Sequence, residues 1–354
     1  MKKNHIVIVS AILLISIILI VFLDSREKSK QEDDLAGELF FPQLKANINT
    51  IARIELKSNE DFNISSDGEN WLVAEKDNFP ADFSKIKQLA ISMANLKTIE
   101  AKTKKPENYD RVGVGSPEDT NGTTKQIALI DNKGETLASL IIGNNKPGAR
   151  AGFYARVPDQ EQAWLLEGKV DYPSTISQWL DKRILDIPAA DVNKIEIKNP
   201  KKNKLVISRP SIESNDFAIG SLPKGKKIKS QATLNQMANS LQGLDLNDVM
   251  SAKNFQFDSS KTSKSRIETK HGLIAEVSVR NQDNQHLAVF QFNYDETLRP
   301  KADDEEQIKK LALTAPDDVK KQVSELNQKT APWVYVLPTH KAEQLSKSLE
   351  DLIE

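Results

Sequence analysis

One strand-like pattern occurs twice in this chain, and the recurrence limits the fold more than any other feature. Residues 51–57 read Ile-Ala-Arg-Ile-Glu-Leu-Lys and residues 192–198 read Val-Asn-Lys-Ile-Glu-Ile-Lys, at an offset of 141 positions. In each copy the apolar residues alternate with charged ones toward the end, which predicts a strand with one buried and one solvated face. The sequence therefore suggests one structural unit that is present twice.

The segments that follow the two copies also correspond. Each copy continues into an apolar stripe with helical spacing, and the paired positions differ by 148: Ile86, Leu89, Ala90, Met93 and Leu96, then Leu234, Met237, Ala238, Leu241 and Leu244. Further strands flank turn residues at 131–134 and 281–284, and each copy closes with an aromatic strand and a short helix. The expected fold class is α+β: two tandem repeats of antiparallel sheet with helices packed on one face.

Residues 6–23 form an apolar run of eighteen residues without a charge. As a helix this run would reach roughly 27 Å, close to the hydrocarbon thickness of a bilayer. Lys2 and Lys3 precede it, whereas the residues after it mix acids and bases. We therefore expect an N-terminal transmembrane helix with a cytoplasmic N-terminus, so that the rest of the chain faces the periplasm, or the outside of a single-membrane cell.

Two other interpretations of this run are a buried core helix and a cleaved signal peptide. A core helix would have one polar face, and this run is apolar all round. The exit at 21–26 reads Val-Phe-Leu-Asp-Ser-Arg, which lacks the small-x-small pattern of a cleavage site. The chain has no cysteine, which excludes a lipid-modified cysteine, disulfides and cysteine-bound zinc. A retained anchor is favoured.

The expected domain organisation follows from these features. It comprises a cytoplasmic N-terminus at 1–5, a transmembrane anchor at 6–23, a polar tether at 24–38, a first α+β repeat at 39–187 and a second at 188–354 with a charged helical insertion at 299–330.

Charge and motif searches exclude several function classes. The 49 basic and 50 acidic residues are interspersed, so the chain lacks the basic surface typical of nucleic-acid binding. Its four histidines have no metal-ligand spacing, no Gly-x-Ser-x-Gly elbow occurs, and residues 113–115 do not continue into a dinucleotide-binding loop. We therefore predict no catalytic residue, no cofactor and no metal, and a protein that is not an enzyme.

Two long insertions are the best candidates for contacting a partner. Residues 102–124 form a loop in the first copy, and residues 299–330 form the charged stretch in the second. Long insertions in compact folds are often functional. The candidate contact residues are Tyr109, Arg111, Gly113, Pro117, Glu305 and Lys309.

Several local motifs resemble one bacterial family. They are Leu-Phe-Phe-Pro at 39–42, Asn-Tyr-Asp-Arg-Val-Gly-Val at 108–114, Ile-Ile-Gly at 141–143 and Trp-Leu-Leu at 164–166. Over residues 39–185 the chain resembles the family known as domain of unknown function 4340. The resemblance implies a single-pass envelope protein, of a kind often encoded beside ABC-transporter components of the gliding-motility type.

Three functions compete. The first is a membrane-anchored periplasmic accessory protein that contacts an ABC-type transporter or another envelope protein. The second is a module that binds an envelope glycan or lipid in a cleft between the repeats, and an enzyme is a distant third.

Overall fold

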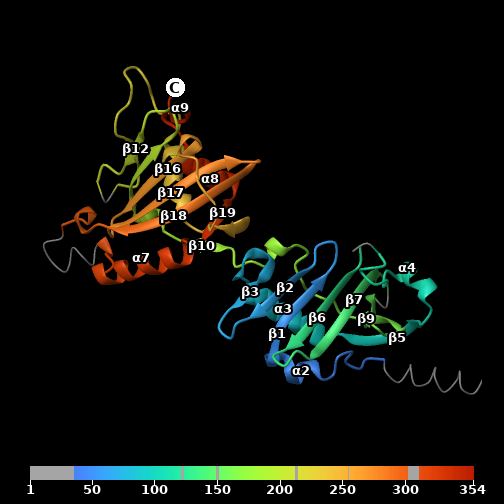
Figure 1. Cartoon of the computed structure of the whole chain (residues 1–354). Coiled ribbons are helices and arrows are strands. Elements are labelled where there is room, and N and C mark those ends of the chain that lie inside the picture. Colours follow the sequence, from blue (N-terminus) through green and yellow to red (C-terminus); the bar gives the residue numbers. More distant parts are fainter. Residues whose placement is uncertain (1–35, 121–122, 149–150, 212–213, 254, 302–310) are drawn as a thin grey trace, which may run out of the picture. The chain divides into compact units, whose positions relative to one another are not determined.

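The computed structural model describes residues 36–120, 123–148, 151–211, 214–253, 255–301 and 311–354. The chain divides into two compact units, unit 1 up to Trp179 and unit 2 from Leu180 (Figure 1). Each unit is built around one large antiparallel sheet.

Unit 1 contains a nine-stranded sheet in which every neighbouring pair is antiparallel. In spatial order its strands are β4 (Phe79–Pro80), β3 (Trp71–Val73), β2 (Phe62–Ser66), β1 (Ile51–Lys57), β6 (Lys125–Asp131), β7 (Thr136–Lys146), β8 (Gly152–Arg156), β9 (Ala163–Glu167) and β5 (Lys97–Thr103). The expected alternation in β1 is confirmed, because Ile54 and Leu56 are buried and Arg53 and Glu55 are not.

The main helix of unit 1 is α3 (Phe83–Ala94). The carboxylate of Asp82 accepts a hydrogen bond from the backbone N–H of Ser84 at 2.9 Å, which caps the first turn. The apolar stripe expected from the sequence is buried, with Leu89 and Met93 fully covered. Two shorter helices lie in the described part of unit 1, α2 (Leu44–Asn47) and α4 (Tyr109–Val112).

Unit 2 contains an eight-stranded sheet with the same connectivity as unit 1, apart from β4, which has no counterpart among the described strands of this sheet. In spatial order its strands are β13 (Ala218–Ile219), β12 (Leu205–Ser208), β11 (Val192–Lys198), β16 (Thr262–Thr269), β17 (Leu273–Gln282), β18 (Gln285–Tyr294), β19 (Trp333–Leu337) and β15 (Asp248–Ser251). Between β17 and β18, Asp283 and Asn284 adopt positive φ angles of 51° and 61°, as a tight hairpin requires.

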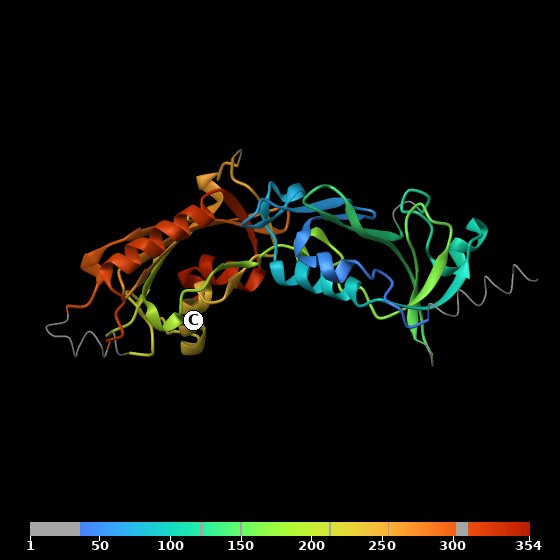
Figure 2. The ribbon, with the colours of Figure 1, turned by 90° about the horizontal axis from the view of Figure 1, so that it is seen from below.

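The helices of unit 2 take different positions relative to its sheet. α8 (Thr339–Ser346) packs on one face, where the Ser265 hydroxyl donates to the carbonyl of Leu345. α7 (Pro316–Thr330) instead runs beside β18 (Figure 1, Figure 2). The Asn327 side chain accepts from the backbone N–H of Phe292 at 2.9 Å and donates to its carbonyl at 2.8 Å. The other α-helices in the described part of unit 2 are α5 (Gln231–Gln236) and α9 (Leu349–Leu352).

The expected fold class, α+β with a transmembrane helix and helices on one face of each sheet, is wrong for the described chain. Both units are mostly antiparallel sheet. The expected second-copy helix shortens to α5 and continues as a 3-10 helix at Met237–Leu241. The expected short helix that closes the first copy is replaced by a 3-10 helix at Ile176–Gln178 and a strand, β10 (Arg183–Leu185), that pairs with β14 (Leu244–Asp245). Ile184 and Leu185 of this strand are buried.

Among the described residues, no helix combines the length and the apolar content needed to cross a membrane. The expected span at 6–23 lies in residues 1–35, outside the part of the chain that the structure describes.

The contact between α7 and β18 can be tested with Asn327→Ala. The substitution removes both hydrogen bonds to Phe292 and leaves a strand amide and carbonyl without their partner, so we expect the free energy of unfolding of unit 2 to fall by about 1–3 kcal/mol. Urea unfolding followed by hydrogen exchange of the β18 amides measures the change. The control is Asn293→Ala, an exposed position on the same strand, and an equal effect of both variants would contradict the contact.

Candidate functional site

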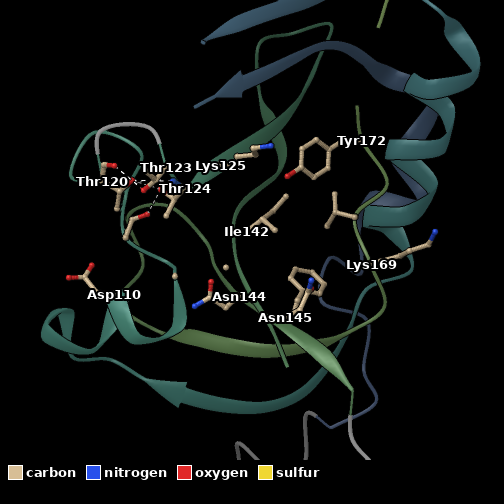
Figure 3. A pocket seen from close by; sticks show the side chains of 15 residues that line it. Asp110, Thr120, Thr123, Thr124, Lys125, Ile142, Asn144, Asn145, Lys169 and Tyr172 are labelled. Carbon is tan, nitrogen blue, oxygen red and sulfur yellow. Dashed lines mark hydrogen bonds between the residues drawn. The ribbon is translucent and has the colours of Figure 1, made fainter. Parts of the chain in front are cut away.

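A polar cavity of about 690 Å³ lies in unit 1, between the 102–124 loop and the strands that it crosses (Figure 3). Its size falls within the range of ligand pockets, roughly 300–1,000 Å³. Fifteen residues line it, and they come from α4, the loop after it, β6, β7, β8 and the segment after β9: Asp110, Gly113, Gly115, Thr120, Thr123, Thr124, Lys125, Ile142, Gly143, Asn144, Asn145, Phe153, Lys169, Val170 and Tyr172.

Close backbone contacts hold the loop against β7. Gly113 ends α4 in the left-handed conformation, with a φ of 72° that favours glycine. A Cβ atom on Gly143 would lie 2.5 Å from the carbonyl oxygen of Val112 and 2.8 Å from that of Tyr154. Only glycine therefore permits the loop and the strand to approach this closely.

Arg156 is the side chain that holds the loop together. It is only 7% exposed, and its Nε donates to the carbonyl of Val114 at 3.0 Å. Its Nη2 donates to the Ser116 hydroxyl at 3.1 Å, and its guanidinium lies 4.6 Å from the centre of the Tyr109 ring. These contacts tie the loop to the end of β8 with charge-assisted hydrogen bonds and a cation–π contact.

An ion pair adds a second attachment of the loop, this time to β1. Lys57 Nζ lies 3.1 Å from Glu118 Oε1. The hydrogen bond with Glu118 is the main reason that the pKa of Lys57 is raised above its usual value. Because both side chains are exposed, the pair contributes little to stability, but it neutralises the lysine on this face of the sheet.

A β-bulge shapes the floor of the cavity. The register between β7 and β8 shifts between Ile142 and Asn145, so β7 carries one extra residue there. Bulges commonly redirect side chains beside functional sites. Here the side chains of Asn144 and Asn145 line the cavity and are exposed, and no hydrogen bond joins them to other described residues (Figure 3).

The rest of the wall combines hydroxyls, cations and an aromatic ring. The Thr124 hydroxyl donates to the carbonyl of Gly115 at 2.9 Å and lies 2.7 Å from the Thr120 hydroxyl. Lys125 Nζ lies 5.5 Å from the centre of the Tyr172 ring, and burial raises the pKa of the Tyr172 phenol. Asp110 supplies a carboxylate on the opposite side (Figure 3). The cavity can therefore bind a polar ligand through both donors and acceptors.

The predicted contact residues of the first insertion lie in α4 and the loop after it, in different surroundings. Tyr109 donates from its hydroxyl to the carbonyl of Glu161 at 2.6 Å, and Gly113 lines the cavity. Pro117 is buried, whereas Arg111 is exposed at the end of α4. Glu305 and Lys309, the candidates from the second insertion, lie outside the described residues.

Arg156, Asn144 and Lys125 belong to the site but were not predicted from the sequence. Arg156 contacts residues about forty positions away, so no local pattern reveals its role. The extra residue of the β7 bulge is also invisible in the alternation of apolar and polar residues. Among the described residues, no group of three or more His, Asp or Glu side chains is arranged to hold a metal ion.

The fold and the loop define a class: a protein of two antiparallel β units, the first of which carries a polar cavity under an inserted loop. The chain belongs to the family described as Domain of unknown function (DUF4340), which matches residues 71–266. This match, more than half of the chain, contains the whole loop and extends into β16 of unit 2. No curated protein and no solved structure matches the chain.

Gly143→Ala tests the close packing of the loop. The new Cβ would meet two backbone carbonyl oxygens, which cannot move as a flexible side chain can, so we expect the free energy of unfolding of unit 1 to fall by about 1–3 kcal/mol. Urea unfolding measures this loss, and trypsin should cut faster after the exposed Arg111.

The matched control is Gly220→Ala in unit 2. There the nearest atom to a new Cβ lies at an ordinary 3.7 Å, so unfolding of unit 2 should change little. If Gly143→Ala lowers the free energy of unfolding of unit 1 no more than Gly220→Ala lowers that of unit 2, the loop is not held by close backbone contact with β7.

Proposed function

We propose that this protein is a non-enzymatic accessory protein of the cell envelope that acts by contacting other proteins. The partner class that we propose is an ABC-type transport system of the gliding-motility type. The proposed location is the inner membrane, with a cytoplasmic N-terminus and the bulk of the chain on the periplasmic side. The uncharged run at residues 6–23 and the lysines before it support this location.

The observation that carries the proposal concerns the 102–124 loop. The sheet holds its inner side in place, and its outer side carries charged side chains. Arg156 and Gly143 secure its inner side. On the outer side Glu107 and Arg111 are exposed, and no ion pair joins Arg111 to another described residue. A loop fixed on a rigid sheet loses little conformational freedom on binding, which favours recognition of a partner.

Family membership supports the choice of partner. The loop lies wholly within the matched residues 71–266. Chains of the family that this sequence resembles are often encoded beside ABC-transporter components, which associates the family with transport without identifying a contact.

Site-specific photo-crosslinking tests the proposed contact. With a photo-reactive benzoylphenylalanine in place of Arg111, we expect a crosslinked membrane or envelope protein after irradiation of intact membranes, because this position faces outward beside the cavity. Mass spectrometry identifies the product. The control position is Lys133, which is exposed in the turn between β6 and β7.

Two results would contradict the proposal. One is recovery of no transporter or other envelope component from position 111. The other is an identical set of products from positions 111 and 133, which would indicate random collisions at the membrane.

A second candidate function is glycan binding, and the cavity of unit 1 favours it. The Asp110 carboxylate and the Asn144 and Asn145 amides supply acceptors and donors, and Tyr172 supplies aromatic surface. Sugar hydroxyls need such paired donors and acceptors, and the apolar face of a sugar ring packs on aromatic side chains.

Isothermal titration calorimetry with tri-N-acetylchitotriose and with maltotriose tests this second function. We expect one of the two sugars to bind, and Asn144→Ala to weaken the binding about tenfold, because a buried sugar hydroxyl loses its partner. Asn132→Ala removes an exposed amide outside the cavity and should leave the affinity unchanged. Failure of both sugars to bind, or equal losses in both variants, would exclude glycan binding in this cavity.

A further inference from the structure

Three lysines follow one another across neighbouring strands on the solvated face of the unit 2 sheet. The ladder between β11 and β16 places Lys198 directly opposite Lys264. On the other side of β11, Ile197 pairs with Leu205, so the next position of that ladder brings Lys204 beside Lys198. All three are exposed. Like charges directly opposite each other destabilise a sheet, so this arrangement needs a reason.

The neighbouring cations on the same face are neutralised by carboxylates. Glu196 lies 2.7 Å from Lys194 and 2.5 Å from Lys204. Arg266 lies 2.8 Å from Glu268 and 3.2 Å from Glu276. Within the described part of unit 2, no carboxylate lies within ion-pair distance of Lys198 or Lys264. Two adjacent positive charges therefore remain uncompensated.

Unit 1 contains the matching position with its charge compensated. Lys57 ends β1 as Lys198 ends β11, and the two strands occupy the same place in their sheets. Lys57 binds Glu118, which the 102–124 loop carries to it. Opposite Lys57, unit 1 has the neutral Gln126 where unit 2 has Lys264. Unit 2 thus has an additional cation at this position, Lys264. The described part of unit 2 has no carboxylate that corresponds to Glu118.

The surface around the lysines is hollowed enough for a ligand. A cavity of about 620 Å³ is lined by all three lysines, by Arg266 and by Ser278. Two carboxylates also line it, Glu196 and Glu276, and they are paired with Lys204 and Arg266. Ser278 lies directly opposite Lys264 in the ladder between β16 and β17, so its hydroxyl is a further donor on the same face.

We propose that Lys198, Lys264 and Ser278 bind a phosphate group, with Lys204 at the margin of the site. The phosphate would supply to unit 2 the negative charge that Glu118 supplies to unit 1. A phosphate monoester with close to two negative charges neutralises both uncompensated lysines, and the phosphodiester of a lipid headgroup neutralises one of them; either group accepts from the serine hydroxyl. The source is either a soluble phosphate ester or the headgroup of an anionic phospholipid.

Calorimetric titration of the full chain with inorganic pyrophosphate tests the site for soluble phosphate. The ionic strength is held constant with sodium chloride, because screening alone would weaken the repulsion between the lysines. We expect saturable binding that Lys264→Gln weakens about tenfold, which corresponds to the loss of one charge-assisted hydrogen bond. Lys226→Gln, an exposed lysine elsewhere in unit 2, should leave the affinity unchanged.

A second arm distinguishes the lipid source. Full-chain protein is sedimented with phosphatidylcholine vesicles that contain or lack phosphatidylglycerol. If the headgroup is the ligand, the extra binding to phosphatidylglycerol vesicles should disappear in the double variant Lys198→Gln/Lys264→Gln and persist in Lys226→Gln. Binding in either the titration or the sedimentation experiment supports the site if it depends on Lys198 and Lys264.

Thermal unfolding distinguishes a binding site from lysines with a purely structural role. The sign of the change in unfolding temperature caused by Lys264→Gln differs between the two cases. Without phosphate at low salt, Lys264→Gln should raise the unfolding temperature of unit 2, because the repulsion is removed. With pyrophosphate the wild-type chain should gain stability and Lys264→Gln should gain less. The proposal is wrong if neither ligand binds, if sodium chloride at equal ionic strength stabilises as much as pyrophosphate, or if Lys226→Gln loses as much affinity as Lys264→Gln.

Discussion

Burial of one face of each sheet decides the strand register, and the register decides where every charged side chain of the two units lies. Ile54 and Leu56 in β1, like Ile195 and Ile197 in β11, are buried. A slip of one residue would move this apolar set to solvent and the charged set into the core, so the register is strongly specified. The end of the same strand then places Lys57 within reach of the loop, and the same constraint determines the lysine row of unit 2.

The sequence predicts those parts of the fold that depend on neighbouring residues. The alternation in β1 and the turn at 281–284 are local, and both appear where they were expected. The Asp82 cap of α3 is equally local. The recurrence of one pattern also has a counterpart in the common strand order of the two sheets. Local chemistry is sufficient for these elements because each depends on spacing, capping or turn preference.

The helices and the site depend on contacts between distant residues, and there the sequence was insufficient. The stripe from Leu234 to Leu244 has helical spacing, yet the α-helix ends at Gln236 and a 3-10 helix completes the buried surface. Burial of the same apolar residues is satisfied by either geometry, so periodicity alone cannot separate them. The expected loop proved to line a cavity, but its organiser, Arg156, lies on a strand whose pattern gives no sign of that role.

The position of α7 has a consequence for how this protein behaves at high concentration. β19 pairs with only the first part of β18, between His286 and Ala288, so the later part of β18 would present unpaired backbone groups. Such exposed strands recruit strands from other molecules and start aggregates. Asn327 occupies the hydrogen-bonding groups of Phe292 on that side. α7 thus covers the unpaired backbone groups of β18 around Phe292. A fragment that lacks α7 would be prone to polymerise through this strand.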